Sequence, residues 1–126
     1  MKRFSFQLIV DPANKFLICE AFGELLEIVE FEHMLKTIIK MAGKNQVNNI
    51  VLDTTECKIL CSNVNIAKLL IKFEENGLFG DLKIARVVKF DPNVKDMIEG
   101  LAAKLCLSIK NVETRSQAML WLLFDK

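Results

Sequence analysis

The chain has 126 residues, which is enough for one domain over residues 1–126 and too few for two cores of ordinary size. Seventeen basic and sixteen acidic residues leave a net charge of +1, which excludes the basic footprint of a nucleic-acid-binding protein. No apolar stretch approaches the roughly 20 residues that span a bilayer, and the N-terminus lacks the apolar region of a signal peptide, so we expect a cytoplasmic protein without an integral membrane segment.

The N-terminal part of the chain predicts a β-hairpin. Apolar residues alternate with polar ones over residues 4–10, as in a strand with one buried face. Residues 11–14 (DPAN) have the composition of a turn, because proline fixes φ while Asp and Asn bond the local backbone. Residues 16–22 then return as a second strand, and we expect Gly23 to close it.

The middle of the chain predicts two helices around a short buried strand. Apolar residues at helical spacing indicate a first helix over about 26–42, with Gly43 as its stop. Residues 49–53 (NIVLD) form a nearly all-apolar run typical of a central parallel strand, and residues 54–61 are expected to be a loop. Ser62 is a suitable N-cap for a second helix that ends at Asn76-Gly77.

The C-terminal third repeats the alternation of strand and helix. Residues 82–88 predict a fourth strand, and Asp91-Pro92 is expected to open a third helix. Residues 107–112 predict a fifth strand, and Thr114 with Gln117 forms a capping box for a last helix over 116–123. The expected buried face of the third helix consists of Val94, Met97, Ile98, Leu101, Ala102 and Leu105.

This element order defines the fold class. Strands separated by helices require crossover connections, and crossovers make neighbouring strands parallel. The N-terminal hairpin makes one strand antiparallel. We therefore predict an α/β fold with a single mixed, mostly parallel five-stranded sheet and four helices, in the order β-β-α-β-α-β-α-β-α.

The sequence lacks the common catalytic constellations. The five glycines are scattered and form neither phosphate-binding loop, and there is no GxSxG motif. The single histidine, His33, lies in an acidic part of the first predicted helix with no nucleophile nearby in sequence. Cys57 and Cys61 are spaced as two metal ligands but lack two more. We therefore expect no enzyme activity, no cofactor and no metal.

One group of polar residues stands out as a candidate binding rim. It lies where a central parallel strand ends and the second helix begins, which is the functional edge in sheets of this kind. A helix N-terminus there presents unpaired N–H groups to an anion or to a partner's carbonyl group. The alternative is that these residues only cap the helix. The predicted rim consists of Asp53, Thr54, Thr55, Ser62, Asn63 and Asn65.

Four segments, in this order, resemble the STAS family, and within it the SpoIIAA-like branch. They are FG at 22–23, IVLD at 50–53, IARVV at 84–88 and QAMLWL at 117–122, which together cover nearly the whole chain. The resemblance implies the SpoIIAA fold and the role of an anti-sigma-factor antagonist, in which a partner kinase phosphorylates a serine at the start of the second helix.

The switch motif itself departs from the family pattern. Alignment of the second helix places Asn63 at the phospho-acceptor position, and a shift of one residue places Ser62 there, so Ser62 is the candidate phosphorylation site. We therefore expect a non-enzymatic binding or regulatory module for a protein partner, without a clear phospho-acceptor motif. The alternative is a carrier of a small apolar or lipid-like ligand, in a pocket lined by phenylalanine and methionine of the second and third helices. The apolar composition also fits a homodimer.

Overall fold

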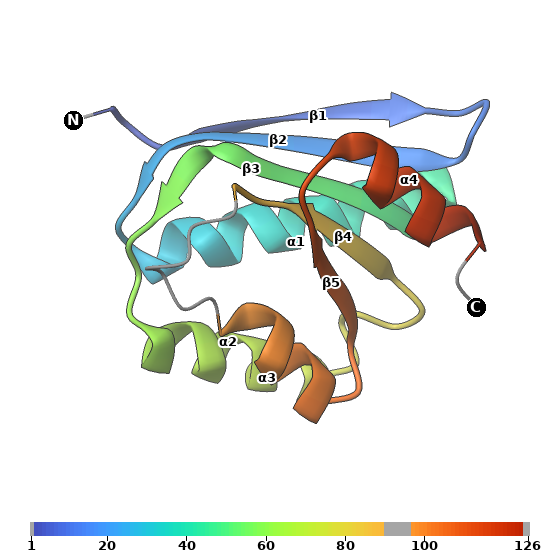
Figure 1. The fold of residues 1–126 in the computed structure, drawn as a ribbon. Coiled ribbons are helices and arrows are strands. Elements are labelled where there is room, and N and C mark those ends of the chain that lie inside the picture. The colour runs from blue at the N-terminus through green and yellow to red at the C-terminus, as the bar shows by residue number, and fades with distance from the viewer. Residues whose placement is uncertain (1, 90–96, 125–126) are drawn as a thin grey trace.

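The computed structural model describes residues 2–89 and 97–124, which form one five-stranded sheet with helices on both faces (Figure 1). The sheet order is β1-β2-β3-β4-β5; β1 is antiparallel to β2, and the remaining neighbours are parallel. The predicted fold class is therefore confirmed. The elements are β1 (Ser5–Asp11), β2 (Phe16–Leu25), α1 (Ile28–Asn45), β3 (Asn49–Ile59), α2 (Asn63–Glu75), β4 (Lys83–Val87), α3 (Ile98–Lys104), β5 (Ser108–Val112) and α4 (Arg115–Phe124).

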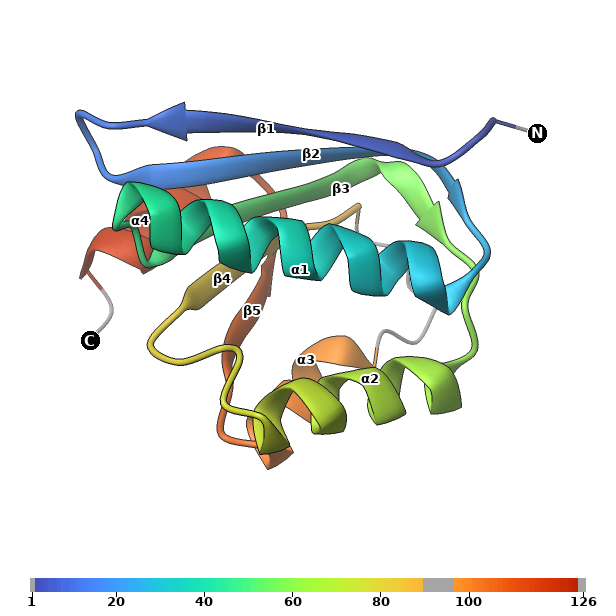
Figure 2. The ribbon, with the colours of Figure 1, turned by 180° about the vertical axis from the view of Figure 1, so that it is seen from behind.

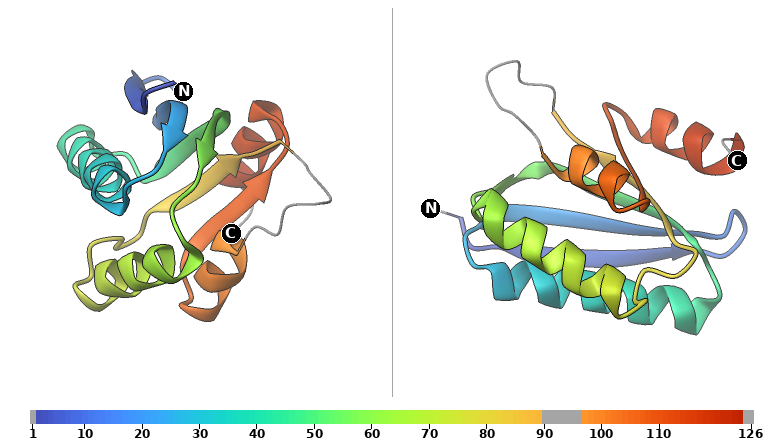
Figure 3. Two further views of the ribbon diagram at one scale, coloured as in Figure 1. Left: turned by 90° about the vertical axis from the view of Figure 1, so that its left-hand side faces the viewer. Right: turned by 90° about the horizontal axis from the view of Figure 1, so that it is seen from below.

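The helices are distributed unequally between the two faces of the sheet. Helices α1, α2 and α3 cover one face (Figure 2), and α4 lies against the other, as the end-on view shows (Figure 3). Side-chain alternation along β2 supplies both cores, because Leu17 and Cys19 point to the three-helix face while Phe16 and Ile18 point to the α4 face. Of the helices in the described ranges, none combines the length and apolarity needed to cross a membrane.

Two strands are longer than predicted. The expected close of β2 at Gly23 is wrong, because β2 continues to Leu25 with Gly23 inside it at φ 86°. The expected loop over 54–61 is wrong as well, because β3 continues to Ile59 and stays paired with β2 up to Leu25 opposite Ile59. This second half of β3 runs beyond the end of β4, which pairs with β3 only as far as Asp53.

The ends of α1 and α3 also differ from the prediction. Gly43 is not the stop of α1, which runs to Asn45 and ends at Gln46 in the left-handed conformation, φ 54°. The predicted start of the third helix at Asp91-Pro92, and Val94 of its expected buried face, lie outside the described residues. Met97, predicted to be buried, is 44% exposed, because it precedes the first turn of α3.

The structure contains the predicted N-cap of α2 and half of the predicted capping box of α4. Ser62 is the N-cap of α2, with its Oγ accepting a hydrogen bond from the Asn65 N–H at 3.2 Å, and α2 ends at Asn76 as predicted. Thr114 Oγ1 accepts from the Gln117 N–H at 3.1 Å, which is one half of the predicted capping box. The other half is shifted by one residue, since Gln117 Oε1 accepts from the N–H of Glu113.

Candidate functional site

A cleft of about 820 Å³ lies at the carboxyl ends of the parallel strands. It exists because the second half of β3 runs on beyond the end of β4. Ligands of open α/β sheets bind at this edge, where the strands end and the following helices begin. The cleft is lined by parts of β2, β3, α2, α3 and β5 and by the residues that follow β4.

The structure brings only part of the predicted rim to the cleft. Thr54 is buried and donates its hydroxyl proton to the carbonyl oxygen of Val87 at 2.9 Å, which ties β3 to the end of β4. Thr55 donates through its N–H and its hydroxyl to Asp53 Oδ1, at 3.0 and 2.7 Å. Of the six predicted residues, Thr54, Thr55 and Asn63 line the cleft, whereas Asp53, Ser62 and Asn65 do not.

The start of α2 lies in an exposed apolar surface. Leu60 follows β3, and its N–H donates to the carbonyl oxygen of Leu25, the last residue of β2, at 2.9 Å, so Leu60 lies near the segment that leads into α1. Ser62, Asn63 and Asn65 are all exposed there. We call these polar residues, together with four apolar ones, the helix-start surface. The apolar residues and their exposed fractions are Leu26 42%, Val29 65%, Leu60 46% and Val64 62%.

Acidic side chains flank this surface. Glu27 is exposed and Glu30 half-buried at the start of α1. Burial raises the pKa of the Cys61 thiol, and the negative charges of Glu27 and Glu30 raise it further, which places both carboxylates near the end of β3. The helix-start surface therefore combines exposed apolar side chains with two nearby carboxylates at the start of α1.

A second polar cluster lies on the opposite face of the sheet, under α4. Arg115 bridges two strands there: its Nη2 donates to Glu20 of β2, and its Nε donates to Asp53 Oδ2 of β3 at 2.9 Å. Burial raises the pKa of Asp53, but the hydrogen bonds from Thr55 and Arg115 outweigh burial and bring it below its usual value. Since the hydrogen bonds of this cluster join α4 to the sheet, we assign Asp53 a structural role.

A buried cation in the cleft was not among the site residues predicted from the sequence. Arg86 of β4 lines the cleft and is only 4% exposed. Burial lowers its pKa to about 10, against the opposing effects of Glu99 and Cys57, so the guanidinium stays charged at neutral pH. Asn111, its register partner on β5, also lines the cleft, and its buried Oδ1 accepts no hydrogen bond from the described residues. The signal in the sequence was a single cation within the apolar run IARVV.

The cysteines of the cleft are poor nucleophiles. Burial raises the pKa of Cys57 to about 11 and also raises that of Cys61, so both thiols are protonated at neutral pH. His33 is exposed and contacts the edge of Phe6, with ring centroids 5.7 Å apart. Over residues 2–89 and 97–124, no three His, Cys, Asp or Glu side chains are grouped so that they could hold a metal ion.

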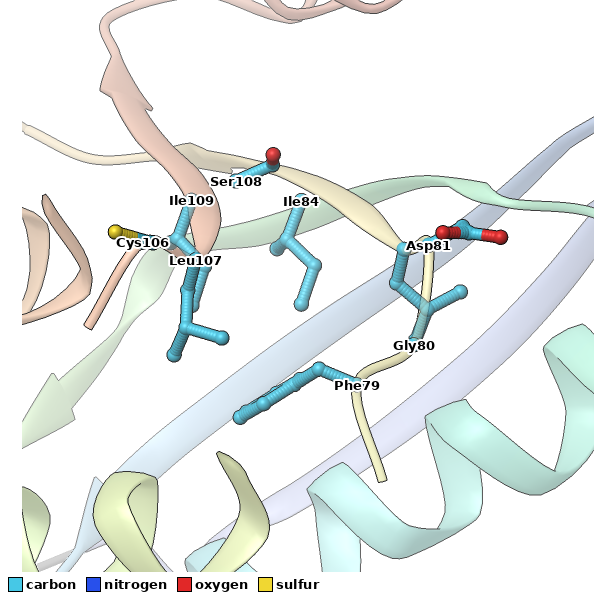
Figure 4. Close-up of a pocket in the computed structure, with 9 residues that line it drawn as sticks. Phe79, Gly80, Asp81, Ile84, Cys106, Leu107, Ser108 and Ile109 are labelled. Carbon is cyan, nitrogen blue, oxygen red and sulfur yellow. The ribbon is translucent and has the colours of Figure 1, made fainter. Parts of the chain in front are cut away.

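The pocket expected between the helices and the sheet is not built as predicted. Phe73 of α2 is completely buried and belongs to the core. Met97 lines the cleft, but the cleft has no phenylalanine among its described lining residues, and its other apolar walls are aliphatic side chains such as Ile59 and Ile66. A smaller cavity of about 200 Å³ lies at the amino ends of β4 and β5, where Phe79 sits below Ile84 and Leu107 (Figure 4).

Comparison with solved structures identifies the fold. The chain is similar to an uncharacterised protein of the DUF3478 family from Shewanella loihica PV-4 that has a SpoIIAA-like fold, with 16% identity, a TM-score of 0.63 and 97% of each chain covered. It is also similar to an anti-sigma factor antagonist from Mycobacterium paratuberculosis, with 14% identity, a TM-score of 0.58 and 94% of each chain covered.

A third similar structure is the anti-sigma factor antagonist SpoIIAA in its unphosphorylated form, with 13% identity and a TM-score of 0.54, over 91% of this chain and 94% of that one. No protein-family description matches the chain, and no curated protein matches it by sequence. The protein therefore has the SpoIIAA-like fold of STAS domains, as the sequence resemblance implied.

Proposed function

We propose that the protein is a cytoplasmic, non-enzymatic binding module that docks another protein on the helix-start surface. The observation that carries this proposal is the exposure of four apolar side chains on two segments that the Leu60–Leu25 hydrogen bond joins: Leu26 and Val29 at the start of α1, and Leu60 and Val64 at the start of α2. Scattered apolar residues on a surface are ordinary, but a contiguous apolar patch with a polar rim is typical of a protein-binding site. The polar rim here is supplied by Ser62, Asn63 and Asn65.

The charges around the patch suggest the chemistry of the partner. Glu27 and Glu30 make the α1 side acidic, so a partner that presents apolar side chains next to Lys or Arg is complementary to it. Two of the similar structures are anti-sigma factor antagonists, whose name denotes action against another regulatory protein. That shared fold supports a regulatory role for the docking proposed here.

Ser62 is the residue through which a kinase would act on this surface. Its side chain is exposed, and its Oγ caps α2 through the Asn65 N–H. A phosphate at a helix N-terminus is favoured by the helix dipole, so phosphorylation would leave α2 intact while adding a dianion beside the apolar patch. We expect such a modification to weaken apolar docking rather than unfold the domain.

The test is a pair of charge substitutions. Val64→Asp places a carboxylate on the helix-start surface, whereas Leu120→Asp does so on α4, where Leu120 is similarly exposed at 59%. A partner isolated with the wild-type protein should lose about tenfold or more in affinity for Val64→Asp and keep its affinity for Leu120→Asp, measured by calorimetric titration. Equal effects of the two substitutions, or the absence of any partner in cells, would contradict the proposal.

A second candidate function is the binding of a small ligand, and the cleft favours it. Its volume of about 820 Å³ lies within the range of pockets that hold small organic molecules. The cleft and the helix-start surface share Asn63 but are otherwise built from different side chains. The two functions can therefore be tested separately.

A further inference from the structure

Strand β1 forms one outer edge of the sheet. Among the described strands, β1 and β5 each have a neighbouring strand on one side only, and no described helix or strand lies beyond β1 in Figure 1 or Figure 2. An outer strand presents backbone N–H and C=O groups with which a strand of another chain can pair. β1 is therefore a candidate surface for the addition of a strand.

The two outer strands differ in how they are protected. Proteins protect such edges with short strands, charged side chains, proline or bulges. β5 has only five residues and includes Lys110, and the N–H of its Asn111 donates to a carboxylate oxygen of Glu99 in α3 at 2.6 Å. β1 has seven residues in continuous register with β2, and residues 4–10 (FSFQLIV) contain neither a charge nor a proline. Of the two edges, β1 is thus the one open to pairing.

The hydrophobic core ends at β1 in a row of half-buried side chains. Phe4, Phe6, Leu8 and Val10 pack against the core of the three-helix face but are only partly buried. Ile9, on the other face of the sheet, is 44% exposed. A strand placed alongside β1 would remove part of this apolar surface from water, which is favourable at about 25 cal/mol per Å². The gain requires a partner strand that is apolar on the same face.

The two ends of β1 carry opposite charges. Arg3 is exposed and bridges to β2 just before the strand, and Asp11 is the last residue of the strand. Hydrogen bonds from Asn14 lower the pKa of Asp11, so its carboxylate is charged at neutral pH. When two identical strands pair antiparallel, the basic end of each lies opposite the acidic end of the other. β1 is therefore complementary in charge to a second copy of itself.

One antiparallel register matches both the charges and the apolar side chains. It places Gln7 opposite Gln7 of the second copy, and every other pair then occurs twice because of the two-fold symmetry. A shift by one residue would bring the apolar row of one strand to the polar row of the other, and a shift by two would separate the opposite charges. The resulting pairs are Arg3 with Asp11, Phe4 with Val10, and Phe6 with Leu8.

From the open edge, its apolar row and its end charges we propose that β1 pairs antiparallel with β1 of a second copy of this chain, which joins the two sheets into one. The inference gives a surface to the homodimer that the composition suggests. No residue of the helix-start surface or of the described cleft lining belongs to β1, so the dimer does not depend on the functions proposed for those sites. A single strand pair makes a small interface, and we expect a dissociation constant in the micromolar range.

Two measurements on the purified protein test the dimer and its surface. Sedimentation equilibrium in low-salt buffer, where surface charges are least screened, gives the dissociation constant. Hydrogen exchange below and above this concentration locates the interface: residues 5–11 should exchange more slowly at the higher concentration, whereas β5 should exchange equally at both. A protein that stays monomeric up to about 500 µM would overturn the proposal. Protection that appears only outside β1 would overturn it as well.

Charge reversals test the register. Arg3→Asp puts a carboxylate opposite Asp11, and Asp11→Lys puts a cation opposite Arg3, so each variant alone should dimerise about fivefold or more weakly than wild type. A mixture of the two variants restores opposite charges at both ends, and the mixed dimer should form with nearly the wild-type affinity. The matched control is Lys110→Asp, the same change of charge on the exposed surface of β5, which should leave dimerisation unchanged.

The outcomes separate this interface from other ways of dimerising. Circular dichroism checks the fold of each variant, and Arg3→Asp with its Lys110→Asp control serves alone if Asp11→Lys does not fold, because Arg3 is exposed. Unchanged dimerisation of Arg3→Asp, or an equal loss in Lys110→Asp, would overturn the pairing through β1. A mixture of Arg3→Asp and Asp11→Lys that associates no more tightly than either variant alone would overturn the register.

Discussion

Arg115 Nε lies 2.9 Å from Asp53 Oδ2, which joins the first residue of α4 to the middle of β3. The same guanidinium donates to Glu20 of β2, so one side chain connects α4 to two neighbouring strands. Gln7 of β1 donates to the other oxygen of Glu20 at 2.6 Å and extends the network to a third strand. Together with the apolar contacts of Ala118 and Leu122, this network holds α4 on its face of the sheet.

We expect Arg115→Met to lower the free energy of unfolding by about 1–2 kcal/mol, since hydrogen bonds to charged groups are lost and two carboxylates are left close together. Urea unfolding followed by circular dichroism measures this change. The control is Lys72→Met, which removes a cation paired with Glu32 at 2.8 Å on an exposed surface and should cost about 0.5 kcal/mol or less. Equal losses would show that the Arg115 network contributes no more than a surface pair.

The same network should make stability depend on acid pH. Hydrogen bonds from Gln7 and Arg115 lower the pKa of Glu20, and the pKa of Asp53 is lowered as well. A carboxylate whose folded pKa is depressed contributes stability above its unfolded pKa of about 4, and this contribution is lost as the pH falls through the folded value. The difference in unfolding free energy between wild type and Arg115→Met should therefore shrink between about pH 5 and pH 3. A constant difference across these pH values would contradict this linkage.

Substitution by alanine should change the stability of the protein in opposite directions at two glycines, Gly23 and Gly43. A Cβ on Gly23 would lie 2.3 Å from the carbonyl oxygen of Arg3, and φ there is 86°. Gly23→Ala should therefore cost about 1–3 kcal/mol or more. A Cβ on Gly43, inside α1, meets no atom within 4 Å, so Gly43→Ala should stabilise the protein by about 0.5–1 kcal/mol. Thermal unfolding of both variants gives the comparison, and a stabilised Gly23→Ala would refute the close approach.

The same two glycines show where sequence patterns sufficed and where they did not. The alternation of strands and helices predicted the order of the elements, because each one carries its own periodicity. Their ends depended on tertiary contacts. Gln46 takes the left-handed position expected of Gly43 because its N–H bonds the carbonyl oxygens of Ala42 and Gly43, and β3 extends to Ile59 because β2 continues beside it.

The candidate site was predictable only in part. Ser62 was recognised as an N-cap because capping is a local property of sequence. Asp53 was placed on the rim, yet its partner Arg115 comes from a helix 62 residues later and could not be paired with it from sequence. Arg86 carried a visible signal, a cation within an apolar strand, but only the position of α3 and β5 shows that it faces a cleft.

The four thiols should react in an order set by burial. Burial raises the pKa of Cys19 to about 12 and that of Cys57 to about 11, whereas Cys106 is exposed. Brief treatment of the native protein with iodoacetamide at pH 8 should label Cys106 first, and Cys19 only after unfolding. Peptide mass spectrometry gives the order of labelling. Early modification of Cys57 would show that the cleft opens more widely than its described walls suggest.

The placement of α4 has a consequence during synthesis. The apolar face formed by Phe16, Ile18, Val51 and Ala85 has α4 as its helical cover, and α4 follows all five strands in the chain. A nascent chain that stalls on the ribosome before residue 115 can close the three-helix core and still expose this face. Such arrested chains should be compact and prone to aggregation, and they should require a chaperone until the last helix has been synthesised.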